Sequence, residues 1–177
     1  MLQILVSQRG VMNTKMKLPL VLMGVAGAGK TRIGKNLAEN LNATFVDGDD
    51  YHPQQNINKM NQGIPLNDND RLVWLEGLNE LLKKESKKGA KVVLACSALK
   101  SIHRRILSQD LLLSFVYLKI DRNTAVKRIE ERENHFFSPS LLDDQFQMLE
   151  EPKNAVIVDA TDSISQVLKI IDQIIDS

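Results

Sequence analysis

The stretch Gly24-Val25-Ala26-Gly27-Ala28-Gly29-Lys30-Thr31 fits the pattern G-x-x-x-x-G-K-[ST] at every fixed position. A mostly apolar run at 18–23 precedes it and apolar residues at helical spacing follow it, so the sequence predicts a strand, a glycine-rich turn and a helix. Backbone N–H groups in such a turn converge on phosphate oxygens, and the helix adds its positive N-terminal end. We expect this stretch to bind ATP, with the Lys30 ammonium between the β- and γ-phosphates and the Thr31 hydroxyl on Mg²⁺. A glycine-rich turn without a ligand is the alternative.

The bulk properties predict one domain without a highly charged partner. The chain has 177 residues and a formal net charge of +1, which gives no reason to expect nucleic acid or membrane partners. No apolar run reaches the length of a transmembrane helix. A single cysteine, Cys96, excludes an internal disulfide and suits a reducing compartment, so we expect a cytoplasmic protein.

The first 17 residues are basic and contain no acidic residue. An organelle-targeting segment is one interpretation, and a plain extension is favoured because arginine is scarce. We therefore expect residues 1–17 to be an N-terminal extension of unknown role and residues 18–177 to form a single domain.

Apolar runs and helical patterns alternate along the rest of the chain. Five β-branched-rich runs predict strands at 18–23, 44–47, 91–96, 114–119 and 155–159. Helical patterns lie at 31–41, 70–84, 98–108, 122–133, 138–149 and from Ser163 onward. This alternation predicts an α/β fold with a five-stranded parallel sheet and helices on both faces. Ligands in such folds bind beyond the C-terminal ends of the strands.

Acidic residues follow the predicted second strand in the run Asp47-Gly48-Asp49-Asp50. Carboxylates so close together repel one another unless a cation or a polyhydroxyl ligand offsets the repulsion. One of them can support Mg²⁺, and another can accept a hydrogen bond from a substrate hydroxyl and then its proton. A solvated acidic turn is the alternative, which the neighbouring phosphate loop makes less attractive.

Residues 54–71 are rich in amides and charges and poor in core residues, which suits an irregular loop that offers hydrogen bonds to a sugar-like molecule. For the individual amides, a flexible surface excursion is the favoured alternative. Arg71 lies where this loop meets the next helix, and its fork suits a carboxylate or phosphate. An ion pair with Asp68 or Asp70 is an equal alternative for Arg71.

The predicted third strand ends in Cys96-Ser97-Ala98-Leu99-Lys100, without an aspartate at its tip. A carboxylate on the metal would therefore come from Asp47 or Asp49. We expect Cys96 to be a buried small residue rather than a nucleophile, because no activating base is evident. Lys100 either faces a substrate or is a solvated helix lysine.

Arg128 and Arg132 are four residues apart, so a helix places them on one face. One interpretation is a lid over about 122–140 whose guanidinium groups close over ATP and stabilise charge on the transferring phosphoryl group. The alternative is a solvated helix face in which neighbouring glutamates pair with both arginines. His135 in the same segment is expected to be structural.

The chain resembles the gluconokinases of the small P-loop type over about residues 18–160. The phosphate loop is shared by a vast superfamily, whereas the D-G-D-D-x-H-P run at 47–53 and the C-S-A-L-K run at 96–100 are much more specific. The similarity continues through Gly63-Ile64-Pro65-Leu66, Asp70-Arg71, Trp74-Leu75, Arg132, His135-Phe136 and Gln145-Phe146. Val73 and Tyr51 depart from the family pattern without removing a charged group.

This resemblance implies a three-layer P-loop kinase fold with a small lid, like those of shikimate kinase and the nucleoside monophosphate kinases. It implies transfer of the γ-phosphate of ATP to the 6-hydroxyl of D-gluconate, giving 6-phosphogluconate and ADP. By matching position it implies catalytic roles for Lys30, Asp49, Arg128 and Arg132, gluconate contacts for Asp49, His52, Arg71 and Lys100, and Mg²⁺ contacts for Thr31 and Asp47. It points to the loop around 159–161 for adenine.

Three alternative functions and one question of assembly stay open at this point, and one of the three is an interaction protein that uses the loop at 54–70 and does not depend on ATP. A P-loop kinase of another small acceptor, such as shikimate or a nucleoside monophosphate, and a non-catalytic ATP-binding module share the same phosphate loop. The expected small-molecule partners are ATP and D-gluconate, and a homodimer remains open.

Overall fold

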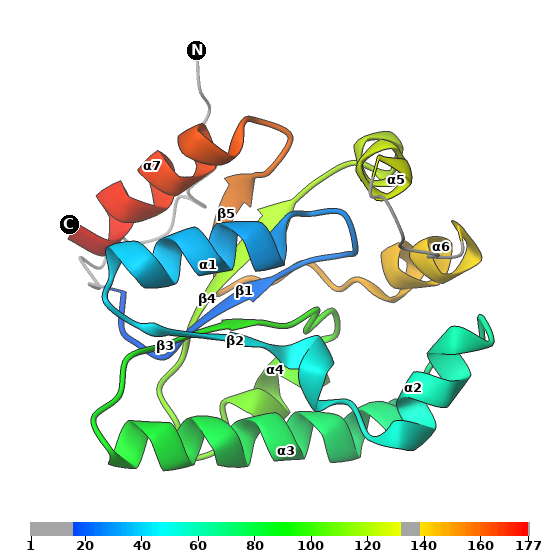
Figure 1. Ribbon diagram of the computed structural model, residues 1–177, viewed down its shortest axis with the longest axis horizontal. Coiled ribbons are helices and arrows are strands. Elements are labelled where there is room, and N and C mark those ends of the chain that lie inside the picture. The colour runs from blue at the N-terminus through cyan, green and yellow to red at the C-terminus, as the bar shows by residue number, and fades with distance from the viewer. Residues whose placement is uncertain (1–15, 132–138, 177) are drawn as a thin grey trace.

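The computed structural model describes residues 16–131 and 139–176 and contains a five-stranded parallel sheet of order β2-β3-β1-β4-β5 (Figure 1). The strands are β1 (Leu20–Met23), β2 (Thr44–Asp47), β3 (Val92–Ala95), β4 (Ser114–Lys119) and β5 (Val156–Asp159). Each lies within its predicted range, so all five predicted strands are confirmed. The predicted α/β class with a parallel sheet is confirmed with them.

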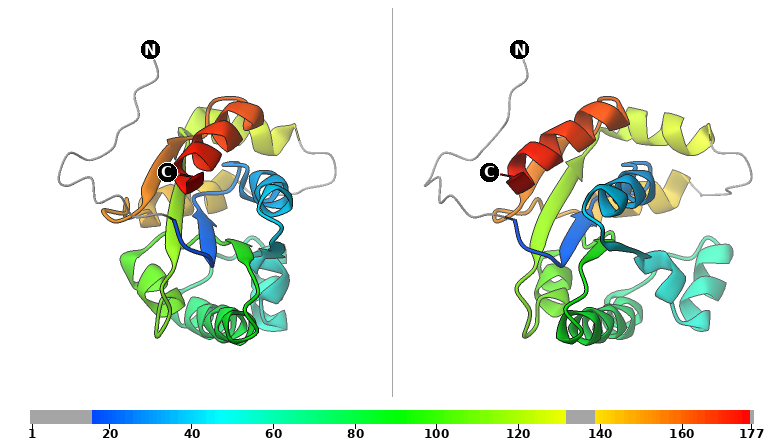
Figure 2. Two further views of the ribbon diagram at one scale, coloured as in Figure 1. Left: turned by 90° about the vertical axis from the view of Figure 1, so that its left-hand side faces the viewer. Right: turned by 60° about the vertical axis from the view of Figure 1, so that its left-hand side comes forward.

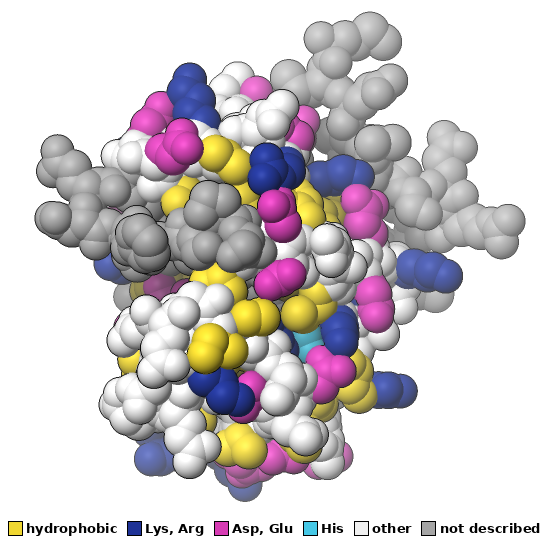
Figure 3. All heavy atoms as spheres, turned by 90° about the vertical axis from the view of Figure 1, so that its right-hand side faces the viewer, with side chains coloured by type: hydrophobic (Ala, Val, Ile, Leu, Met, Phe, Trp, Pro, Cys, Tyr) yellow, Lys and Arg dark blue, Asp and Glu magenta, His cyan; other side chains and the backbone are white. Residues whose placement is uncertain are grey.

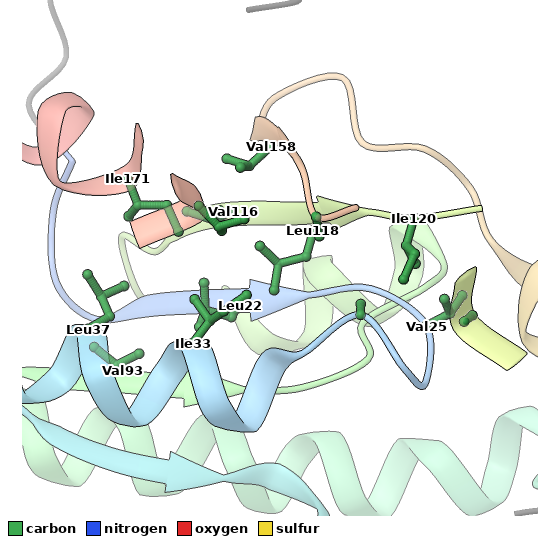
Figure 4. Packing of buried hydrophobic residues seen from close by; sticks show 14 of the residues in the cluster. Leu22, Val25, Ile33, Leu37, Val93, Val116, Leu118, Ile120, Val158 and Ile171 are labelled. Carbon is green, nitrogen blue, oxygen red and sulfur yellow. The ribbon is translucent and has the colours of Figure 1, made fainter. Parts of the chain in front are cut away.

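Helices cover both faces of the sheet and make three layers (Figures 1 and 2). One face carries α1 (Lys30–Asn40) and α7 (Ile164–Asp176), and the other carries α3 (Asp68–Lys87) and α4 (Ser101–Leu107). The central strand β1 is buried along its whole length, and its side chains alternate between two apolar clusters. Leu20 and Leu22 belong to the cluster under α1 and α7, and Leu22 lies beside Ile33 in Figure 4. Val21 and Met23 belong to the cluster that includes the buried side chains of α3. A strand covered on both sides has to be apolar at every position, which explains why the run at 18–23 was readable from sequence.

The long helix α3 buries the face that its spacing predicts. Trp74, Leu75, Leu78 and Leu82 are buried, and Leu81 is half-buried. The helix begins at Asp68, two residues before the predicted start, because Asn67 and Asp70 form a reciprocal capping box.

The prediction of an irregular loop over 54–71 is wrong except at 62–67, because helices occupy both ends of this range. Residues Gln54–Asn61 form helix α2, preceded by a 3₁₀ turn, η1, at Gly48–Tyr51. Helix α2 has no apolar stripe, since Asn56 is the residue that it buries. The Asn56 amide nitrogen donates to the Asp70 carbonyl oxygen at 2.8 Å, so polar contacts attach this helix to the start of α3.

Beyond the C-terminal ends of the strands lie α5 (Arg122–Glu130) and α6 (Pro139–Met148) (Figure 1). The Arg122 guanidinium joins them through two hydrogen bonds to the Asp143 carboxylate. The predicted lid at about 122–140 includes α5 and only the first two residues of α6, and it stays a prediction. Arg132, His135 and Ser138 lie outside the described residues.

Residues 1–15 of the expected extension also lie outside the described residues. Met16 packs against the core, and the Lys17 amide donates to the Ser114 hydroxyl at 2.8 Å. Among the described helices, none is long and apolar enough to cross a bilayer.

Gly48 offers a direct test of the packing between β3, α3 and the acidic run. The Trp74 indole nitrogen donates to the Gly48 carbonyl oxygen at 2.8 Å, and a Cβ on Gly48 would lie 2.7 Å from the Ala95 carbonyl oxygen. We expect Gly48→Ala to lower the free energy of unfolding by about 1–3 kcal/mol, because a strand backbone atom cannot turn aside. Urea unfolding measures the change.

Gly77 supplies the matched control, because it lies on the exposed side of α3 and a Cβ added there would meet no atom within 4 Å. Gly77→Ala should raise the free energy of unfolding by about 0.5–1 kcal/mol through helix propensity. Shifts of the same sign in the two variants would contradict the packing argument.

Candidate active site

The phosphate loop connects β1 to α1 and depends on glycine. Gly24 and Gly27 have φ angles of 142° and 81°, which L side chains rarely adopt. A Cβ on Gly24 would lie 2.8 Å from the Leu118 carbonyl oxygen, and one on Gly27 would lie 2.8 Å from the Ala125 carbonyl oxygen. The loop backbone therefore lies directly against β4 and α5.

Polar groups of this loop have internal partners. The Lys30 ammonium donates to the Gly24 and Val25 carbonyl oxygens, each at 2.9 Å. The Ala26 amide donates to the Gln145 side-chain oxygen on α6 at 2.7 Å. Binding of ATP to the loop amides would therefore change the hydrogen bond of Gln145. The motifs in the sequence assigned no role to this residue. Its only signal in the sequence was its place in the Gln145-Phe146 similarity.

The predicted Mg²⁺ contacts, Thr31 and Asp47, touch each other. The Thr31 hydroxyl donates to Asp47 Oδ2 at 2.8 Å, while Asp47 Oδ1 accepts from the Asp49 amide at 3.2 Å. A hydroxyl and a carboxylate are hard oxygen ligands of the kind that Mg²⁺ takes together with phosphate oxygens and water. The described residues contain no group of three or more acidic, histidine or cysteine side chains that could hold a metal alone. The residues present fit a Mg²⁺ ion that arrives with a nucleotide.

The acidic run continues into a buried histidine. His52 stacks on Trp74 with ring centroids 4.0 Å apart, and its Nε2 lies 3.9 Å from Asp49 Oδ1. Burial, and secondarily the charge of Arg71, lowers the pKa of His52 to about 4. The ring is therefore neutral at pH 7. The Asp49 side chain is 75% exposed, so its carboxylate is accessible to an acceptor molecule.

Arg71 is buried, and its predicted alternative role in an ion pair is not found among the described residues. Its Nε donates to the Leu66 carbonyl oxygen at 3.3 Å. The carboxylates considered for that pair bind lysines instead: Lys59 contacts both oxygens of Asp70 at 2.7 Å, and Lys100 contacts Asp68. Lys100 is thus held at the start of α4 rather than solvated along a helix.

Figure 3 faces the end of the molecule that carries α2, α5 and α6. Acidic and basic side chains lie interspersed there, with apolar ones and a histidine between them. A mixture of both charge signs over one face suits a ligand that has anionic ends and hydroxyl groups.

A cavity of about 440 Å³ adjoins the phosphate loop on the side of α7. Its lining includes Gly27, Arg32, Arg128, Ala160 and Ser163. The volume lies in the range typical of small-ligand sites. The cavity reaches the loop after β5, where the resemblance placed adenine.

Arg128 borders this cavity and donates to the carbonyl oxygens of Thr161 and Asp162 at 3.2 and 3.5 Å. The described contacts therefore attach α5 to the loop after β5. The predicted action of Arg128 on the transferring phosphoryl group stays a prediction.

Cys96 is buried, and burial raises the pKa of its thiol to about 12. A thiol with such a pKa carries almost no thiolate at neutral pH. The expectation that Cys96 is a buried small residue is confirmed, and the raised pKa of its thiol argues against a nucleophilic role.

Comparison with known proteins gives one consistent assignment. A family model described as shikimate kinase matches residues 26–175. The thermosensitive gluconokinase of Escherichia coli strain K12 is 46% identical over 134 residues, which are 75% of this chain and 72% of that protein. A probable gluconokinase of Xenopus tropicalis is 39% identical over 178 residues, covering 89% of this chain and 93% of that protein. The crystal structure of a gluconokinase from Sinorhizobium meliloti 1021 superposes with a TM-score of 0.81 at 35% identity, over 89% of this chain and 90% of that one.

The buried histidines predict how stability depends on pH. Burial also lowers the pKa of His103 to about 4, so between pH 6.5 and 4 the unfolded chain binds protons at His52 and His103 that the folded chain does not. The stability that depends on these neutral rings is present above pH 6.5 and is lost as the pH falls toward 4. Each ring contributes a slope of up to about 1.4 kcal/mol per pH unit.

Urea unfolding at pH 7, 6 and 5 should therefore show falling midpoints. His52→Gln and His103→Gln should each make the midpoints depend less on pH, whatever they do to stability at pH 7. An unchanged pH dependence in the double variant would contradict this account.

Proposed function

This chain belongs to the gluconokinase family, and we propose that it transfers the γ-phosphate of ATP to the 6-hydroxyl of D-gluconate, giving 6-phospho-D-gluconate and ADP. The observation that carries this proposal is the contact between the phosphate loop and the acidic run. The Thr31 hydroxyl donates to the Asp47 carboxylate at 2.8 Å, and this contact supports a position for Asp49 beside the expected γ-phosphate. The relatives do not favour a kinase of shikimate or of nucleoside monophosphates.

On the nucleotide side, the loop amides and the N-terminal end of α1 bind the phosphates of ATP. Lys30 exchanges carbonyl oxygens for phosphate oxygens, which costs little because the ammonium keeps its hydrogen bonds. Thr31 and Asp47 would hold Mg²⁺, which supplies charge neutralisation on the β- and γ-phosphates. Adenine occupies the cavity beside Ala160.

On the acceptor side, Asp49 accepts a hydrogen bond from the 6-hydroxyl and orients it toward the γ-phosphorus. As the O6–P bond forms and the bond from phosphorus to the leaving ADP oxygen breaks, Asp49 takes the hydroxyl proton. Neutral His52 can exchange a hydrogen bond with a sugar hydroxyl without adding charge. Arg71 and Lys100 bind the carboxylate at the other end of gluconate.

The lid arginines, Arg128 and Arg132, would add positive charge as α5 and α6 close over ATP. The active unit is residues 18–177 as one domain, with its lid at about 122–140. A reducing compartment suits the free thiol of Cys96, so we assign the activity to the cytoplasm. A homodimer is compatible with this scheme and is not needed for it.

The direct test measures ATP consumption by the purified protein with Mg²⁺. We expect turnover with D-gluconate and none above background with shikimate, CMP, AMP or no acceptor. Lys30→Ala should lower kcat by at least about 100-fold, because it removes a preorganised charge from the transferring group. Lys35→Ala, on the same helix, is the control and should stay within about twofold of the unchanged protein. Turnover with a different acceptor alone would reject the gluconate assignment.

Asp49 is tested separately by Asp49→Asn. We expect kcat for gluconate to fall by about 10²–10⁴-fold, the usual contribution of a positioned base, with a smaller change in the KM for ATP. Asp50→Asn alters the exposed neighbour in the same run and should change kcat by no more than about twofold. Equal losses of kcat and ATP affinity in Asp49→Asn would assign Asp49 to the nucleotide instead.

A further inference from the structure

Asp68 lies where the proposed carboxylate-binding groups meet. The Lys100 ammonium donates to Asp68 Oδ1 at 2.7 Å and to Oδ2 at 3.0 Å. Lys100 precedes α4 and Asp68 begins α3, so the pair bridges two helices on the same face of the sheet. The Lys100 side chain is 27% exposed and that of Asp68 is 68% exposed. A confined ammonium is therefore paired with a carboxylate that remains largely in solvent.

Two further donors belong to the same group of side chains. The Nδ1 atom of His103 accepts from the Lys100 amide at 3.3 Å, so the proton of the neutral ring is on Nε2. That Nε2 atom is buried and has no hydrogen-bond partner among the described residues. Arg71 contributes a buried guanidinium whose Nε alone is engaged in a described hydrogen bond. The Lys100 hydrogen bond is the main cause that holds the pKa of Asp68 below its usual range, and the charges of Lys100 and Arg71 act in the same direction.

Asp70, two residues along α3, shows what a structural carboxylate looks like in this segment. It accepts from the Asn67 amide to close the capping box, and it binds Lys59 with both oxygens at 2.7 Å. The carboxylate of Asp68 takes part in no cap, and among the described residues Lys100 is its hydrogen-bond partner. Several contacts fix the Asp70 carboxylate. Another anion can take the place of the Asp68 carboxylate on Lys100, because Asp68 then loses only its contact with Lys100.

We propose that Asp68 is a specificity-determining residue that competes with the carboxylate of the acceptor for Lys100. This inference rests on the proposed function and deepens it. Without an acceptor, Asp68 neutralises Lys100 and keeps small anions from settling between Lys100 and Arg71. An aldonate displaces Asp68 because it offers a carboxylate to Lys100 together with hydroxyl groups to the rest of the site. Asp68 thereby adds the same cost to the binding of every anion, so it sets the affinity for a carboxylate acceptor relative to a neutral polyol, and an aldonate offsets the cost through its hydroxyl contacts.

The test is Asp68→Asn, which keeps the shape of the side chain and removes its charge. We expect the KM for D-gluconate to fall by about two- to fivefold, the range for release of a partly exposed ion pair. The effect should be on KM for gluconate rather than on kcat or on KM for ATP. Asp110→Asn is the matched control, because Asp110 is 77% exposed and pairs at 3.5 Å with Lys83, whose side chain is 20% exposed. That variant should change neither constant.

Calorimetric binding without ATP separates this inference from the proposed function. Asp68→Asn should bind D-gluconate more tightly by the same factor, and should bind the neutral analogue D-glucitol no differently from the unchanged protein. In a Lys100→Gln background the gain should disappear. A weaker affinity in Asp68→Asn would make Asp68 a direct gluconate ligand, and an unchanged affinity would leave the pair purely structural; either result overturns the inference. Absence of gluconate turnover in the unchanged protein would instead overturn the proposed function, while the binding comparison still decides the role of Asp68.

Discussion

The close approach of the phosphate loop to β4 and α5 is the constraint on which the rest of the site depends. Only glycine fits at Gly24 and Gly27, because a Cβ at either position would lie 2.8 Å from a backbone oxygen. This contact positions the first turn of α1, and with it Lys30 and Thr31, against the end of β2. At the end of β2, the Asp47 carboxylate accepts the hydrogen bond from the Thr31 hydroxyl. Two tight backbone contacts at the C-terminal end of the central strands thus constrain where the phosphate loop lies relative to the end of β2.

Polar groups throughout this site already have internal partners. The pairs are Lys30 with the Gly24 and Val25 carbonyls, Ala26 with Gln145, Thr31 with Asp47, and Lys100 with Asp68. Such pairs avoid the desolvation free energy that a buried or confined polar group costs when it has no hydrogen-bond partner. Binding of ATP and gluconate is therefore an exchange of partners, and the affinity measures the difference between two sets of contacts. Small changes in the internal set, as at Asp68, can then alter selectivity without touching the ligand.

Sequence alone predicted the sheet because burial on both faces makes each strand an apolar run, as at β1. It predicted the phosphate loop because that geometry restricts residue type. It failed for α2, whose buried residue is the polar Asn56, so no apolar periodicity marked a helix. The sequence could not decide whether Arg71 pairs with Asp68 or Asp70 or stays available to a ligand. The lysines that bind these two carboxylates come from other elements. Contacts between distant segments, such as Gln145 with the phosphate loop, leave no local pattern.

The polar attachment of α2 has a consequence for how the molecule opens. The described contacts from this helix to the start of α3 are a hydrogen bond from the Asn56 side chain and an ion pair from Lys59. By contrast, α3 packs against the sheet through Trp74 and several leucines. Local opening follows buried apolar contact, so α2 belongs to the least protected cooperative unit and α3 to the most protected. Amide hydrogens of α2 will exchange with solvent through fluctuations that leave the sheet intact. Helix α2 can therefore move on its own, at a free-energy cost well below that of global unfolding.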